Sequence, residues 1–137
     1  MKSKFYLLPV VFSIFIVCMA TVSTSSFNIK PGMIKVVILY PNGEGKNFNM
    51  DYYSSKHMPM AAKLFGDSLK AMSIDKGLSA GAPGAPMPYL AAGYFYFENM
   101  ASCQKLMSAH SAQLRADVVN YTNTVPVIQI SEVMRAE

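Results

Sequence analysis

Four short apolar runs along the chain have the periodicity of β-strands. β-branched and aromatic residues dominate these runs, and clusters of Gly, Pro and Asn end them. The expected strands cover residues 33–40, 71–78, 89–98 and 124–134. The first and third strands are apolar on both faces, so both faces should be covered. Pro126 cannot donate a hydrogen bond to a neighbouring strand, which predicts that the last strand begins at a sheet edge or a bulge.

Two segments between these strands carry the start and stop signals of helices. Asn49 is a favourable N-cap for the first helix, which Gly66 should end. Asn99 is the equivalent N-cap of the second helix, which should run to about Ala109. A separate helical turn is expected in residues 112–118.

The resulting order is strand, helix, strand, strand, helix, strand. This order is typical of the α+β ferredoxin-like βαββαβ arrangement, a four-stranded antiparallel sheet with two helices on one face. In a monomer the other face of the sheet would be exposed to solvent, although the first and third strands are apolar on that face as well. We therefore expect a homodimer in which two sheets pair face to face and enclose an α+β barrel.

The N-terminal segment has the layout of a secretory signal peptide, with a charged start, an apolar run and a small polar exit. Residues 1–20 are predicted to be cleaved after Ala20, residues 21–32 to form a tether, and residues 33–137 to form the domain. The protein would then be exported, to the periplasm or out of the cell, with no membrane attachment. Two alternatives stay open: lipidation of Cys18, and retention of the uncleaved segment as a membrane anchor.

Charge and cysteine content narrow the range of partners. The whole chain has a net charge of +4, but from Pro31 onward nine Lys or Arg stand against eight Asp or Glu, a net charge of +1. No basic stripe remains, which argues against binding of nucleic acid. After cleavage Cys103 is the only cysteine, so no intrachain disulfide can form and the fold must rest on its core.

His57 is the first candidate for chemistry. Helical spacing places it on an apolar stripe with Tyr53 and Ala61, so it should point inward. Pro59 removes an amide donor and disturbs the carbonyl of Ser55, so the helix should kink or restart there. An inward imidazole could act as a general acid or base, with Tyr53 orienting it or donating to an oxyanion. The alternative is a structural histidine bonded to a backbone carbonyl that the proline frees.

Metal and haem sites have weaker support. Met58 and Met60 flank Pro59 beside His57, and thioethers with imidazole can hold copper, but the two methionines project to different sides of a helix. Ligands for zinc are lacking. His110, expected at a helix end, could ligate haem, although a lone exposed histidine suits that position without any ligand. No phosphate loop or dinucleotide fingerprint occurs, so we expect neither a metal nor a cofactor.

Polar side chains near the third and fourth strands could line a pocket. Tyr94 and Tyr96 share one face of the third strand, while Asn120 and Tyr121 precede the last strand. Phenols in a partly apolar pocket would suit a small oxygenated organic molecule. The alternative is ordinary strand composition, which favours tyrosine.

Three stretches of the sequence together resemble the EthD family of dimeric α+β barrel proteins. They are VVILYPNGEGKNFNMDYYSSKHMPMAAKLFG, DKGLSAGAPGAPMPYLAAGYFYF and NYTNTVPVIQISEV, and the likeness runs from about Met33 to Val133. The resemblance implies the ferredoxin-like fold and the dimer. It also places the family's histidine-before-proline motif on His57, with Tyr53 beside it. The family is named for an association with ether-degradation genes, and the leader peptide departs from the usual pattern of such proteins.

The resemblance implies a range of activities. Proteins with this fold include cofactor-independent isomerases, dehydratases, polyketide cyclases, monooxygenases and haem-degrading enzymes. Our first hypothesis is a small domain that binds an oxygenated organic molecule and performs isomerase, dehydratase or decarboxylase chemistry through His57. The alternative is a non-catalytic binding or accessory protein of the cell envelope, and a haem-binding or monooxygenase-type protein is less favoured.

Overall fold

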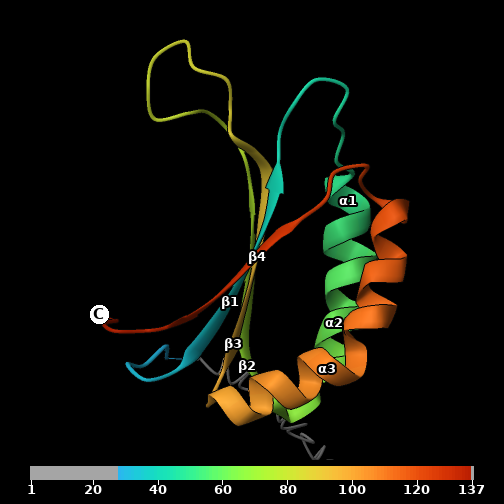
Figure 1. Ribbon diagram of the computed structural model, residues 1–137. Coiled ribbons are helices and arrows are strands. Elements are labelled where there is room, and N and C mark those ends of the chain that lie inside the picture. Colours follow the sequence, from blue (N-terminus) through green and yellow to red (C-terminus); the bar gives the residue numbers. More distant parts are fainter. Residues whose placement is uncertain (1–27, 137) are drawn as a thin grey trace, which may run out of the picture.

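The computed structural model describes residues 28–136 (Figure 1). The predicted signal peptide, residues 1–20, and most of the predicted tether, residues 21–32, lie outside the described residues. The described end of the tether is joined to the domain, because the N–H of Gly32 donates to the carbonyl of Val133 at 2.8 Å. No helix within the described range combines the length and the apolar character needed to cross a bilayer.

Within residues 28–136 the strands and helices follow the predicted order. In chain order they are β1 (Ile34–Pro41), α1 (Met50–Tyr52), η1 (Tyr53–His57), α2 (Met58–Phe65), η2 (Gly66–Ser68), β2 (Leu69–Lys76), β3 (Tyr89–Phe97), α3 (Met100–Asp117), η3 (Val118–Asn120) and β4 (Val127–Glu132). The segments α1, η1 and α2 follow one another without a break. Strand ends differ from the predicted ends by only a few residues.

The four strands form one sheet in the order β2-β3-β1-β4. All three pairings are antiparallel. This order, with two helical segments that connect the strands and form one layer, is the ferredoxin-like arrangement, and it confirms the predicted fold class. β4 is an edge strand that begins directly after Pro126, as the missing amide of the proline requires.

The first helical segment begins and ends at the predicted residues. The side chain of Asn49 accepts a hydrogen bond from the N–H of Tyr52 at 3.0 Å, which satisfies one of the free amides of the first turn. Gly66 ends α2 with a φ of 53°, a left-handed conformation that glycine adopts more easily than other residues.

A widened turn interrupts this segment immediately before Pro59. Residues Tyr53–His57 form a π-helical turn in which the N–H of Met58 donates to the carbonyl of Tyr53. In a regular α-helix the proline ring would clash with the carbonyl of Ser55 and leave it without its amide donor. The wider turn avoids the clash between the proline ring and the Ser55 carbonyl. It corresponds to the kink or restart that the sequence predicts at Pro59.

The second helix is longer than predicted. α3 is continuous to Asp117, so the predicted end near Ala109 is wrong. No Gly or Pro occurs within α3, and apolar side chains continue to pack against the core through Met107, Leu114 and Val118. Figure 1 shows α3 changing direction along its length, but the helix is not interrupted.

The helices lie on one face of the sheet (Figure 1). The hydrophobic core lies between the helices and the sheet. Val36, Phe95 and Phe97 of the sheet are buried here, and the ring of Phe65 from α2 makes edge contacts with both phenylalanines. Burying each such side chain stabilises the fold by roughly 1.5–3 kcal/mol. Cys103 of α3 is fully buried in the same core.

No helix covers the opposite face of the sheet within the part of the chain that the structure describes (Figure 1). Strand alternation places Val37 and Leu39 of β1 on this face, with Tyr94 of β3 opposite Val37. These side chains are only partly buried. The sheet therefore presents an apolar surface that residues 28–136 leave uncovered. We call it the bare face.

Candidate functional site

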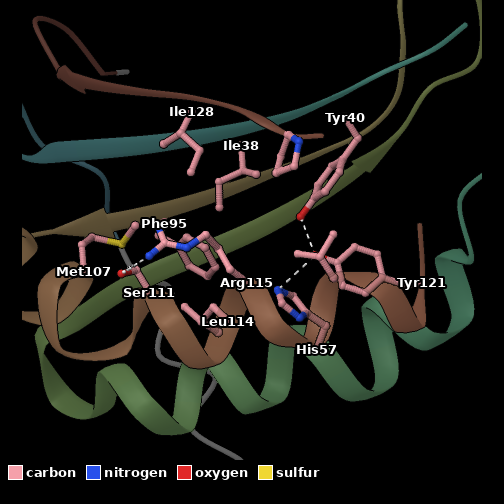
Figure 2. Close-up of a pocket in the computed structure, with 12 residues that line it drawn as sticks. Ile38, Tyr40, His57, Phe95, Met107, Ser111, Leu114, Arg115, Tyr121 and Ile128 are labelled. Carbon is pink, nitrogen blue, oxygen red and sulfur yellow. Dashed lines mark hydrogen bonds between the residues drawn. The ribbon is translucent and has the colours of Figure 1, made fainter. Parts of the chain in front are cut away.

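A pocket lies between the sheet and α3, at the side of the sheet where β4 forms the edge (Figure 2). Its volume is about 80 Å³, and one side is open. Most of its lining is apolar, with a few polar side chains among them. The lining residues are Ile38, Tyr40, His57, Phe95, Met107, Ser111, Leu114, Arg115, Val118, Tyr121, Pro126 and Ile128. There is room for a small molecule, or for one end of a larger one.

His57 lies at the wall of this pocket and is 5% exposed. Its Nδ1 is 2.8 Å from Oδ2 of Asp117, the last residue of α3. A carboxylate can only accept here, so Nδ1 carries the proton and Nε2 of the neutral ring is left as an acceptor. The hydrogen-bond partner of His57 is thus a carboxylate and not the backbone carbonyl of the structural alternative.

Asp117 is held by three donors. Besides His57, the Tyr52 hydroxyl donates to its Oδ1 at 2.9 Å and the Asn120 amide donates to the same oxygen at 2.8 Å. Burial by itself would raise the pKa of Asp117, but the hydrogen bonds from His57, Asn120 and Tyr52 outweigh it and lower this pKa below its usual value. Asp117 therefore stays ionised and fixes the orientation of the imidazole.

Two buried phenols extend the network from His57 to the sheet (Figure 2). The hydroxyl of Tyr121 is 3.4 Å from Nε2 of His57 and 2.8 Å from the hydroxyl of Tyr40 on β1. Burial raises the pKa of both phenols well above the ordinary value. Both hydroxyls therefore keep their protons near neutral pH, and Tyr40 can donate to Tyr121 while Tyr121 donates to His57.

Tyr53 supports the imidazole with its ring and not with its hydroxyl. The two rings stack, with centroids 5.5 Å apart and planes 18° apart. The hydroxyl points away from His57 to the backbone of Gly93 on β3, at a place that the Cβ of any other residue would occupy. It is buried and has no hydrogen-bond partner in the described part of the chain.

The remaining candidate residues are distributed over both sides of the sheet. Asn120 belongs to the network through Asp117, whereas Tyr94 and Tyr96 lie on the bare face, across the sheet from the pocket. His110 is partly buried within α3, with its ring centroid 6.3 Å from that of Phe65.

The structure offers little to a metal ion. Met58 is 1% exposed in the core, whereas Met60 lies within 3.9 Å of the side-chain amide of Gln113. Among residues 28–136 no three His, Cys, Asp or Glu side chains are grouped closely enough to hold a metal.

Sequence reasoning missed Asp117, Tyr52 and Arg115. Asp117 and Arg115 fell in a segment where no continuous helix was expected, so their faces could not be assigned. Had α3 been extended without a break, Asp117 would have been placed at its C-terminal end, one turn before Tyr121. Nothing in local spacing shows that this end meets His57, because that contact spans 60 positions along the chain.

The fold and the site define a ferredoxin-like α+β protein with a histidine–aspartate pair at the wall of an apolar pocket. The EthD domain family matches residues 43–124, more than half of the chain, and this chain belongs to the EthD family.

Two solved structures illustrate the similarity. An EthD-like protein from Ralstonia eutropha JMP134 is 37% identical, with a TM-score of 0.73; the match covers 79% of this chain and 97% of that one. An ethyl tert-butyl ether D (EthD) family protein from Bacillus halodurans C-125 is 20% identical, with a TM-score of 0.57; the match covers 74% of this chain and 99% of that one and shows the fold alone. None of the curated proteins compared with the chain matches it.

Proposed function

We propose that this protein binds a small oxygenated organic molecule in the pocket and transfers a proton to or from it through His57. The observation that carries the proposal is the placement of His57. Its Nδ1 is fixed by an ionised carboxylate, while Nε2 lies beside a phenol that lines an apolar pocket. This combination suits a general base that becomes a general acid in the return step.

The chemistry can be derived from the pair and the phenols. Nε2 of His57 takes a proton from a carbon next to a carbonyl group, and the ionised Asp117 stabilises the resulting imidazolium. The Tyr121 hydroxyl, itself hydrogen-bonded to Tyr40, donates to the developing oxyanion. Since this hydroxyl is 3.4 Å from Nε2, the substrate oxygen would replace Nε2 as its acceptor. Return of the proton from the imidazolium to a different carbon gives isomerisation. Transfer of that proton to a hydroxyl on the β-carbon, which then leaves as water while the enolate forms a C=C bond, gives dehydration.

The test uses cyclopentanone as a probe in heavy water. Exchange of the protons beside its carbonyl is followed by the loss of their NMR signals. The wild-type chain should accelerate this exchange, and His57→Gln should lower the acceleration by about a hundredfold or more. His110→Gln is the matched control, because it changes the other histidine outside the pocket, and it should exchange protons like the wild type.

Two results would contradict the catalytic role. In the first, the wild type exchanges protons no faster than His57→Gln. In the second, cyclopentanone shifts the NMR signals of His57 without any faster exchange. The second result would favour the non-catalytic binding protein over the enzyme.

We also propose that two copies pair through the bare face. Val37, Leu39 and Tyr94 form an apolar surface there that a second sheet would cover. Such pairing leaves the helices outside and the pocket between sheet and α3 intact. Export, proposed from the layout of residues 1–20, would place this dimer in the periplasm or outside the cell.

A further inference from the structure

We propose that the ligand of this pocket is a carboxylate, and that Arg115 with Ser111 binds its charged group. This inference rests on the proposed function, because it names the substrate class of the same site. It concerns the end of the pocket that lies away from the histidine–aspartate pair.

Among the described residues that line the pocket, Arg115 is the one permanent cation. None of the other lining residues is a Lys or Arg, and none is an Asp or Glu. A guanidinium stays protonated in proteins and offers several N–H donors in a fork that matches a carboxylate. The Arg115 side chain is exposed, so a ligand that enters from solvent can reach its guanidinium.

Most N–H donors of the Arg115 guanidinium are available to a ligand. Its hydrogen bond within the described chain is to the hydroxyl of Ser111, at 3.3 Å and one helical turn earlier on α3. The ion pair found among the described residues joins His57 and Asp117, so no carboxylate of residues 28–136 neutralises Arg115. The Ser111 hydroxyl lines the pocket too and can donate to the same anion.

Arg115 lies at one end of the pocket, and the residues proposed to transfer protons lie at the other. Figure 2 shows the Arg115 side chain directed towards Ser111 and Met107, whereas His57, Tyr121 and Tyr40 gather at the other end. A ligand anchored by its carboxylate at Ser111 would thus place a second oxygen near the Tyr121 hydroxyl. Keto acids and lactones with a carboxylate on a short apolar chain have this pattern of groups.

The mouth of the pocket fits the apolar part of such a ligand. A more open groove shares Arg115, Val118, Pro126 and Ile128 with the pocket, and we call it the outer groove. Its other lining residues are the apolar Val119 and Val125 and the polar Thr122, Asn123 and Thr124. Val119 and Val125 are each 81% exposed. Longer or more branched acids could rest there without disturbing the anchored carboxylate.

The experiment compares levulinate, a small keto acid, with its uncharged methyl ester, by NMR titration of the full chain. The wild type should bind levulinate about ten- to a hundredfold more tightly than the ester. Arg115→Met should remove this preference by lowering the affinity for levulinate far more than the affinity for the ester, and Arg115→Lys should keep part of it. Lys105→Met is the matched control, since it removes a charge from an exposed position of α3 outside the pocket, and it should behave like the wild type.

Equal affinity of the wild type for acid and ester would overturn the carboxylate assignment. So would a preference that survives Arg115→Met. Ser111→Ala gives a second, milder test, with a smaller loss of affinity for levulinate alone. Failure here differs from failure of the acid–base proposal. In the first case the wild type exchanges cyclopentanone protons but binds acid and ester equally well, and in the second it prefers levulinate but exchanges no protons.

Discussion

Asp117 joins the two helical segments, α1–η1–α2 and α3, through one carboxylate. Its three donors come from η1, from α1 and from the turn after α3. The hydrogen bonds lower its pKa, so the folded protein gains stability from the ionised form. That stabilisation is complete above the pKa of an unfolded aspartate, about 3.9, and is lost as the pH falls through the lower pKa of the folded state.

Asp117→Asn should lower the free energy of unfolding by about 1–3 kcal/mol at pH 7. The difference from the wild type should shrink below about pH 4, where the wild-type carboxylate also begins to take up its proton. Chemical unfolding at several pH values measures it. Asp67→Asn, at an exposed residue, is the control and should show no such pH-dependent loss. A loss at pH 7 that stays constant down to pH 2 would contradict this account.

Gly93 leaves room for the hydroxyl of Tyr53 against the sheet. Gly93→Ala should therefore destabilise the fold by about 1–3 kcal/mol, because the new methyl group meets that oxygen. Tyr53→Phe alone should be nearly neutral, since the hydroxyl it removes is buried without a partner.

The double variant separates this explanation from a general intolerance of β3. Gly93→Ala in the Tyr53→Phe background should cost much less than in the wild type, as measured by thermal unfolding of all four proteins. Additive losses would show that the Tyr53 hydroxyl is not the obstacle.

At the scale of single residues, the sequence predicts which side chains point inward better than it predicts which of them contact one another. Periodicity placed His57 and Tyr53 on the inward face, and both are buried there. Tyr121 and Asn120 were chosen as polar residues before the last strand, and they contact the network. Tyr94 and Tyr96 were chosen as phenols that share one face of the third strand, but they lie on the bare face and not at the pocket. Which face borders the pocket depends on where the helices pack, and strand alternation alone does not decide it.

Elements were predictable where strong local signals exist. Caps at Asn49 and Asn99 and the glycine at position 66 set the helix ends that were found. The second helix was predicted to end near Ala109, with a separate helical turn in residues 112–118, although no Gly or Pro lies between them. Its continuation is fixed by packing of Leu114 and Val118 on the core, a tertiary effect.

The π-helical turn shows how one residue sets the geometry of an element. Pro59 removes an amide, the preceding turn widens, and His57 closes that wider turn. Pro59→Ala would restore the amide and allow a regular α-helix, which turns His57 relative to Asp117. We expect the exchange of cyclopentanone protons to fall by up to about a hundredfold, while thermal stability does not fall.

Pro83→Ala is the matched control for this change, because that proline lies in the exposed loop between β2 and β3. It should leave exchange unchanged. If Pro59→Ala kept full exchange, the widened turn would have no role in placing the imidazole.

At the scale of the whole molecule, the helices of the described residues cover one face of the sheet and leave the bare face open, and this face gives the assembly prediction. Val37→Glu places a charge beside Tyr94 and Gln129, in the middle of the proposed contact. Burying an unpaired carboxylate between two sheets is costly, so this variant should be a monomer by sizing chromatography with light scattering, at a concentration where the wild type is a dimer. Lys105→Glu, on the helical side, should leave the dimer intact. A wild-type protein that is monomeric at high concentration would contradict the proposed pairing through the bare face.

Tyr121 couples the pocket to a distant part of the backbone. Its hydroxyl lies between Tyr40 and His57, while its carbonyl accepts the N–H of Asn49 at 2.7 Å, at the start of the first helical segment. A ligand that restricts the motion of Tyr121 should therefore slow the opening of the hydrogen bond at the start of that helix. Hydrogen–deuterium exchange at the Asn49 amide would then report occupancy of the pocket from outside it, which makes this backbone group a sensor for screening ligands whose chemistry is still unidentified.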